Sequence, residues 1–135
     1  MNIIIIFIIT FISFVILDGS WIFYNFDYYM TLCKKIQKEP FHLKIPAIII
    51  SYIILCIALL VYLRVITLEI NAQKKYNKYM IAVIYGCLFG LVIYGTYSFT
   101  SCTYYKNYSY FDALIDTTWG MILFSLMGIL FVLLN

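Results

Sequence analysis

Two aspartates, each followed three residues later by a tryptophan, are the residues whose types and spacing could carry out chemistry. Asp18 and Trp21 lie near the start of the chain, and Asp116 and Trp119 lie near its end. Residues three apart share one helix face, so each indole N–H could donate to the carboxylate of its own pair, or the indole could point to the lipid interface instead. A carboxylate can exchange a proton, bind a cation or act as a general acid or base.

The chain around both pairs has the composition of an integral membrane protein. Apolar residues make up 65% of its 135 residues and charged residues only 11%, whereas a soluble domain is about half apolar and a quarter charged. A carboxylate in hydrocarbon costs roughly 2.5–3.5 kcal/mol on insertion scales, so intramembrane acids usually face a partner or a cavity. Both aspartates are therefore expected to face a polar site within the protein.

Four apolar segments predict the fold, because each is near the ~20 residues that a helix needs to cross a bilayer. They are expected at residues 3–26, 45–63, 79–100 and 113–134. The first is expected to be a retained helix, since it lacks the basic start and the small-residue cleavage site of a signal peptide. The prediction is one all-α transmembrane domain, an integral membrane bundle of four helices. Its orientation and its membrane are not determined, because basic residues on the two faces nearly balance.

The connection after the first span has no helix breaker before Pro40. Residues 27–39 carry apolar or aromatic side chains together with lysines, among them Tyr28, Tyr29, Leu32 and Ile36 with Lys34, Lys35 and Lys38. That spacing is typical of a continued first helix or of a short amphipathic helix at the membrane interface.

Helix direction is expected to bring the polar residues of all four spans into one leaflet. Asp18 comes late in the first helix and Asp116 comes early in the fourth, which runs the opposite way. The polar end of the third helix and Ser51 and Tyr52 of the second enter at the same side, while Asp112 is expected to be solvated. The candidate polar pocket comprises Asp18, Trp21, Tyr94, Thr96, Tyr97, Thr100, Asp116 and Trp119.

Small residues predict where helices pack closely. Gly86 and Gly90 form a GxxxG step in the third span, and Gly120 follows Trp119. A GxxxG step gives a smooth face for backbone-to-backbone packing. It serves either contacts inside the bundle or a homo-oligomer formed through the Gly86/Gly90 face.

Three functions remain open for the aspartates. They could join helices by hydrogen bonds, form a proton, cation or headgroup site, or act as paired carboxylates of a lipid-directed membrane enzyme. The leading interpretation is non-enzymatic: proton- or small-solute-linked transport, or a role in membrane assembly. No catalytic triad, phosphate-binding loop, cofactor motif or metal-ligand spacing is present, and His42 is a lone loop histidine. The lipid bilayer is the expected partner, and the loop lysines, which give a net charge of +3, do not indicate nucleic acid.

Three motifs resemble a known family. Leu17-Asp18-Gly19-Ser20-Trp21 resembles the LDxxW signature of small predicted membrane proteins catalogued as domain of unknown function 2177. Residues 86–101 are similar to that family's GxLFGLxxYATYDLTN stretch, and residues 116–120 match its DxxWG. The resemblance implies a four-helix membrane protein of unknown activity. The family's acid in the third helix falls on Ser98 here, and its terminal asparagine falls on Ser101.

Overall fold

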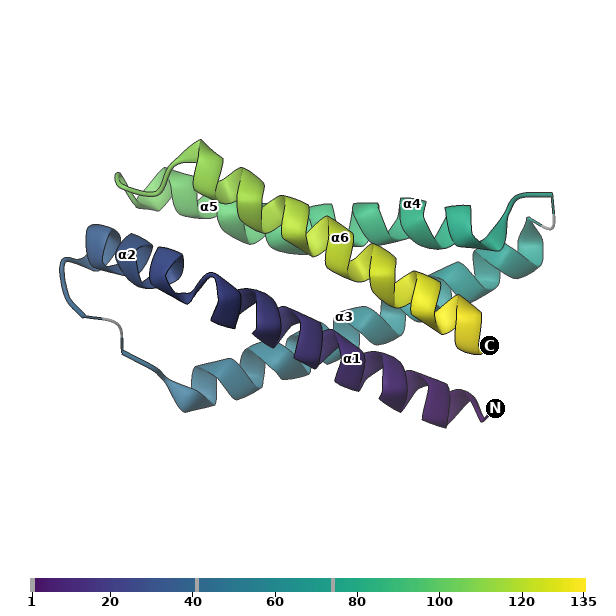
Figure 1. The fold of residues 1–135 in the computed structure, drawn as a ribbon. Helices are drawn as coiled ribbons and strands as arrows, with labels where there is room; N and C mark the ends of the chain where they lie inside the picture. The colour runs from purple at the N-terminus through teal and green to yellow at the C-terminus, as the bar shows by residue number, and fades with distance from the viewer. Residues whose placement is uncertain (1, 41, 74) are drawn as a thin grey trace.

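The computed structural model describes residues 2–40, 42–73 and 75–135, and positions 1, 41 and 74 lie outside the described residues. Four helices in these ranges are long and apolar enough to cross a membrane: α1 (Ile3–Tyr24), α3 (Ile45–Ala72), the continuous segment Lys78–Tyr104, and α6 (Tyr110–Leu134). They run alternately up and down, and both termini lie at one end (Figure 1). The predicted all-α membrane bundle is confirmed.

Three spans are longer than the sequence predicted; the third, expected at residues 79–100, is helical over Lys78–Tyr104. Helix α3 continues to Ala72, nine residues past the expected end. Arg64 and Glu69 do not interrupt its backbone hydrogen bonding, and no Pro or Gly stands between residues 64 and 72. Helix α6 begins three residues early, at Tyr110. There Ser109 and Asp112 form a capping box that satisfies free N–H groups of the first turn. Charged residues near the predicted ends therefore do not end these helices.

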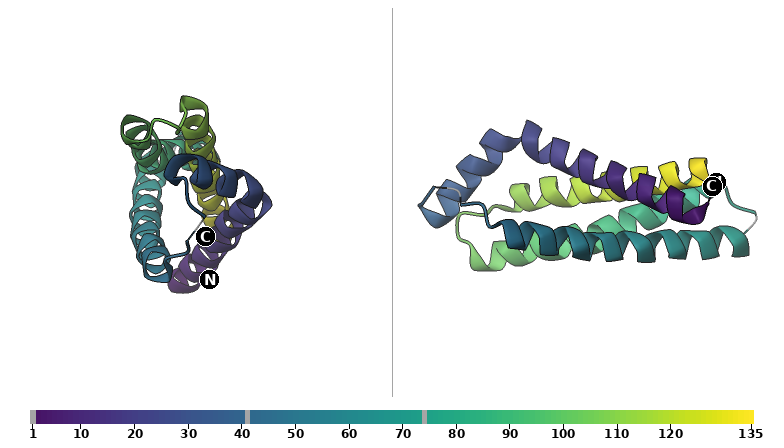
Figure 2. Two further views of the ribbon diagram at one scale, coloured as in Figure 1. Left: turned by 90° about the vertical axis from the view of Figure 1, so that its left-hand side faces the viewer. Right: turned by 90° about the horizontal axis from the view of Figure 1, so that it is seen from below.

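A short helix follows the first span, as expected. Helix α2 (Phe26–Gln37) is separated from α1 by a break at Asn25 and is inclined to it (Figure 2). Its Leu32 is buried against Tyr108, just before α6, and Ala113, in the first turn of α6. Helix α2 therefore packs on the end of the bundle where the fourth span begins.

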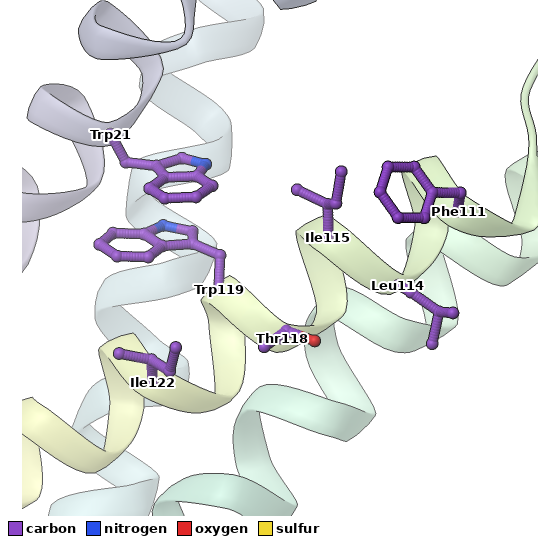
Figure 3. A pocket seen from close by; sticks show the side chains of 7 residues that line it. All are labelled: Trp21, Phe111, Leu114, Ile115, Thr118, Trp119 and Ile122. Carbon is purple, nitrogen blue, oxygen red and sulfur yellow. The ribbon is translucent and has the colours of Figure 1, made fainter.

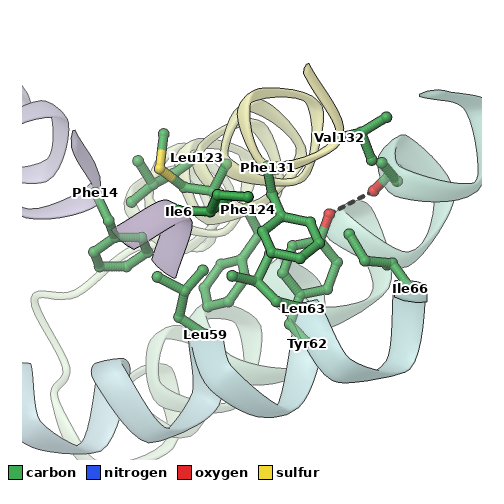
Figure 4. Packing of buried hydrophobic residues seen from close by; sticks show 12 residues of the cluster. Ile6, Phe14, Leu59, Tyr62, Leu63, Ile66, Leu123, Phe124, Phe131 and Val132 are labelled. Carbon is green, nitrogen blue, oxygen red and sulfur yellow. Dashed lines mark hydrogen bonds between the residues drawn. The ribbon is translucent and has the colours of Figure 1, made fainter. Parts of the chain in front are cut away.

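Helix α6 lies at the centre of the bundle. Half of its apolar stretch is buried inside the protein, against 11% for α3, whose side chains mostly face the surroundings. Figure 4 shows the core that α6 makes with α1 and α3, where Phe14 and Tyr62 each meet the ring of Phe124 edge-on. The buried cluster comprises Ile6, Phe14, Leu59, Tyr62, Leu63, Ile66, Ala82, Leu123, Phe124, Met127, Phe131 and Val132.

The third span packs directly on α6 through its glycines. Gly86 and Gly90 are buried in α4 (Lys78–Gly90). A β-carbon added at Gly86 would lie 2.5 Å from Ser125 Cα. A β-carbon added at Gly90 would collide with the backbone of Gly120. The GxxxG step therefore serves packing inside the bundle. Helix α6 occupies the Gly86/Gly90 face in the structure, and a homo-oligomer through this face stays a prediction.

We expect Gly90→Ala to lower the stability of the bundle. The added methyl group forces α4 away from α6, and overpacking of this kind costs about 1–3 kcal/mol. Gly19→Ala is the matched control, because a β-carbon there meets nothing within 4 Å. Thermal unfolding in detergent, followed by circular dichroism, measures both; equal melting temperatures for the two variants would contradict the close packing.

Candidate functional site: two buried carboxylates joined by aromatic side chains

Asp18 accepts hydrogen bonds from three other helical segments. The hydroxyls of Tyr52 and Tyr94 donate to its carboxylate at 3.0 and 3.2 Å, and the indole Nε1–H of Trp119 donates at 3.1 Å. The residue is only 6% exposed. All of these donors are neutral, so they solvate the carboxylate without cancelling its charge.

Asp116 accepts two hydrogen bonds from tyrosines outside the spans. Tyr29 in α2 donates at 2.7 Å, and Tyr108 in the connection before α6 donates at 2.9 Å. Asp18 lies six residues before the end of α1, and Asp116 lies six residues after the start of α6. At about 1.5 Å per residue, both carboxylates are about 9 Å from helix ends on the same side of the bundle.

The two tryptophans stack on each other between the aspartates. The rings of Trp21 and Trp119 are 4.4 Å apart and nearly parallel, as Figure 3 shows. Trp119 donates to Asp18, and Trp21 donates to Tyr29 Oη at 3.0 Å, which in turn donates to Asp116. Neither indole donates to the aspartate of its own pair. Trp119 reaches from α6 to Asp18 on α1, whereas Trp21 reaches from α1 to Tyr29 on α2.

Asp112 is buried and hydrogen-bonded, so its expected solvation is wrong. Its carboxylate accepts from the backbone N–H and the hydroxyl of Ser109 at 2.8 and 2.6 Å, and from the hydroxyl of Tyr28. The side chain is only 7% exposed. Its first role is to cap α6, and its second is to hold α2 through Tyr28.

The tyrosines of α2 are site residues that the sequence did not single out. Burial raises the pKa of Tyr29 and Tyr28, and the hydrogen bonds to Asp116 and Asp112 raise these pKa values further. Burial also raises the pKa of Tyr108. These phenols therefore stay protonated donors at physiological pH. Their only signal in the sequence was the amphipathic pattern of residues 27–39, which places Tyr28 and Tyr29 beside an apolar helix face.

A wide helical turn holds Tyr94 at the site. Residues Leu91–Gly95 form a π-helix, η1, between α4 and α5 (Thr96–Tyr104). Such turns insert an extra residue into an α-helix and often occur at functional sites. Here the turn lies between the glycine packing of α4 and the polar part of α5, and Tyr94 in it faces both Gly120 and Asp18.

A cavity of about 620 Å³ lies beside the carboxylates. Its wall includes Asp18, Asp116, both tryptophans and Tyr97, whereas Thr96 and Thr100 are exposed and do not line it. Ser98, also in the wall, is completely buried; it has Tyr108 as a polar neighbour but its hydroxyl makes no hydrogen bond of ordinary geometry. None of the described residues in the wall is Lys, Arg or His.

The tryptophan pair separates this cavity from an apolar groove. The groove, of about 390 Å³, runs along the outer face of α6 and is drawn in Figure 3. Both tryptophans line the groove and the cavity. The rest of the groove is lined by Phe111, Leu114, Ile115, Thr118 and Ile122.

The arrangement suits charge exchange better than metal coordination. Among the residues that the structure describes, no group of three or more His, Cys, Asp or Glu side chains could hold a metal ion. The carboxylates are held by phenol and indole donors at the edge of a cavity, where a proton or a cation could neutralise them.

Comparison with known proteins gives a family but no activity. Residues 3–133 match the family model described as "Predicted membrane protein (DUF2177)", so the chain belongs to this family. No curated protein matches the chain, and no solved structure does. Ser98, where the resemblance places the family's third-helix acid, lies in the cavity wall with Asp18 and Asp116.

We expect Tyr29→Phe to destabilise the protein by about 1–2 kcal/mol, because it removes the donor to Asp116 and leaves Trp21 without its acceptor. Tyr110→Phe is the control, since Tyr110 is 73% exposed. Thermal unfolding in detergent measures both. A melting temperature of Tyr29→Phe equal to that of the control would show that this bridge contributes nothing to stability.

The stacked indoles should give a distinctive optical signal. Two indole rings at this distance couple their electronic transitions. The intensity of the indole bands in the near-ultraviolet circular dichroism of the wild-type protein should therefore exceed the sum of the indole bands of the Trp21→Phe and Trp119→Phe variants. The chain has only two tryptophans, so nothing else contributes to the indole bands. Spectra that simply add would contradict the stack.

Proposed function

We propose that this member of the DUF2177 family exchanges protons for a cationic solute at Asp18 and Asp116, as part of small-solute transport. The observation that carries the proposal is the setting of the two carboxylates. They lie at matched depth about 9 Å from the helix ends, receive hydrogen bonds only from neutral groups, and border a cavity.

The charge of the site supports this proposal. At an effective dielectric constant near 20, two like charges repel by about 2 kcal/mol at 8 Å and by about 4 kcal/mol at 4 Å. A proton or a cation on either carboxylate removes this repulsion and lowers the cost of keeping the charge in hydrocarbon. Since the described wall offers no basic side chain, the neutralising charge has to come from outside the protein.

The proposed exchange conserves charge. A cation entering the cavity takes the place of a proton on a carboxyl group, and the proton leaves to water. A rise in proton concentration drives the reverse step and releases the cation. Tyr29 and Tyr108 keep their hydroxyl protons throughout, so they position Asp116 without competing for the exchanged proton.

A structural role in the bundle is the second candidate. The three donors to Asp18 come from α3, η1 and α6, so this one carboxylate joins all four spans. Membrane hydrogen bonds of this kind contribute about 0.6–2 kcal/mol each. In this alternative the cavity has no ligand and the aspartates only hold the helices together.

Asp18→Asn and Asp116→Asn test the two candidates. In lipid nanodiscs, wild-type protein is titrated with Na⁺, K⁺, tetramethylammonium and decyltrimethylammonium, and proton release is followed with a pH-sensitive dye. We expect release with at least one cation, on the order of one proton per cation bound, and its loss in either Asn variant.

Asp27→Asn is the matched control, because Asp27 is an exposed acid in the first turn of α2 that does not line the cavity. It should release protons as the wild type does. Absence of proton release from wild-type protein with all four cations would overturn the exchange proposal. A coupled loss of stability in the two Asn variants would then favour the structural role.

A further inference from the structure

The cavity is larger than a proton or a metal ion requires. At about 620 Å³ it lies within the range of roughly 300–1,000 Å³ that is usual for sites that bind organic molecules. Its wall combines two carboxylates with apolar side chains from α1, α2, α3 and η1, namely Ile22, Met30, Ile54, Leu55 and Ile93. A ligand that fills it needs both a charged end and an apolar part.

Aromatic rings surround the charged end. Trp21, Trp119, Tyr29, Tyr94 and Tyr97 all contribute to the wall. Organic ammonium groups are attracted to the faces of such rings when they lie within about 6 Å, and Trp is the best of them. Carboxylates and aromatic faces therefore favour the same chemistry, an organic cation.

The cavity is open toward the lipid between α1 and α3. Ile22 on α1 and Ile54 on α3 line it and are still 44% and 59% exposed. Figure 1 shows α3 diverging from α1 and α2 toward the end where α2 lies. This opening is in the half of the bundle that holds both carboxylates.

We propose that the solute is an amphipathic organic ammonium that enters from the lipid. Its ammonium group lies by Asp18 and Asp116 against the stacked indoles, and its alkyl chain leaves between Ile22 and Ile54. A phosphate beside the ammonium would meet two carboxylates and no basic side chain among the described wall residues, so a simple alkylammonium fits better. This inference rests on the proposed exchange function and names its substrate class.

Binding in nanodiscs tests the substrate class directly. Both tryptophans line the cavity and the apolar groove, so their fluorescence responds to binding at either place, and the Asp18→Asn variant identifies the part of the response that comes from the cavity. We compare dissociation constants expressed as the aqueous concentration of each cation. The constant for decyltrimethylammonium should be at least about tenfold lower than that for tetramethylammonium, because its chain concentrates it in the bilayer. The neutral amphiphile decyl maltoside should cause no saturable change, and Asp18→Asn should abolish the response to both cations.

Two neighbouring isoleucines test the lateral route. Ile54 lines the cavity, whereas Ile53 is similarly exposed (55%) and does not. Ile54→Phe should narrow the opening and weaken decyltrimethylammonium binding by about fivefold, while tetramethylammonium binding stays unchanged. Ile53→Phe should bind both cations as the wild type does.

The outcomes separate the substrate from the exchange. Equal affinities for tetramethylammonium and decyltrimethylammonium, with proton release intact, would overturn the amphipathic substrate and leave proton exchange standing. Equal effects of Ile54→Phe and Ile53→Phe would overturn the route between α1 and α3. Failure of every cation to release protons would overturn the exchange function itself.

Discussion

The solvation of the Asp18 carboxylate in a membrane is the constraint on which the rest of this structure depends. One charged group far from water needs several donors, and a single helix cannot supply them because its own N–H groups are already used. Tyr52, Tyr94 and Trp119 supply them from the other three spans. The position of one side chain in α1 is thus linked to the packing of α3, η1 and α6.

The molecule divides along its length into a packed half and a polar half. Near the termini, α6 packs against α1, α3 and α4 through Phe124, Tyr62 and the glycine contacts. Toward α2 the spans separate, and the space between them is bordered by tyrosines and carboxylates. The tight half fixes the relative positions of the helices. The polar half can therefore hold a cavity without losing the geometry of its hydrogen bonds.

Helix α2 connects the membrane bundle to its surface on the polar side. Tyr29 and Tyr28 reach Asp116 and Asp112, while Leu32 packs on the start of α6. The side chain of Asn107 also donates to the Lys35 carbonyl at 2.9 Å, which ties the connection between α5 and α6 to α2. Helix α2 therefore supplies one of the two donors to Asp116, although it lies outside the spans.

By itself, the sequence determined the class, the four apolar helices and the common half of the bundle in which Asp18 and Asp116 lie, because hydropathy and helix direction depend only on residue order. It placed Tyr94 and Tyr97 near the site but also Thr96 and Thr100, which lie exposed. The hydrogen bonds of Trp21 and Trp119, the burial of Asp112, the π-turn and the donors from α2 were decided by tertiary structure alone. Helix periodicity gives the helix face on which a side chain lies. The hydrogen-bond partner of that side chain depends on the distance and rotation of the neighbouring helices. This distance and rotation follow from packing at Gly86, Gly90 and Gly120.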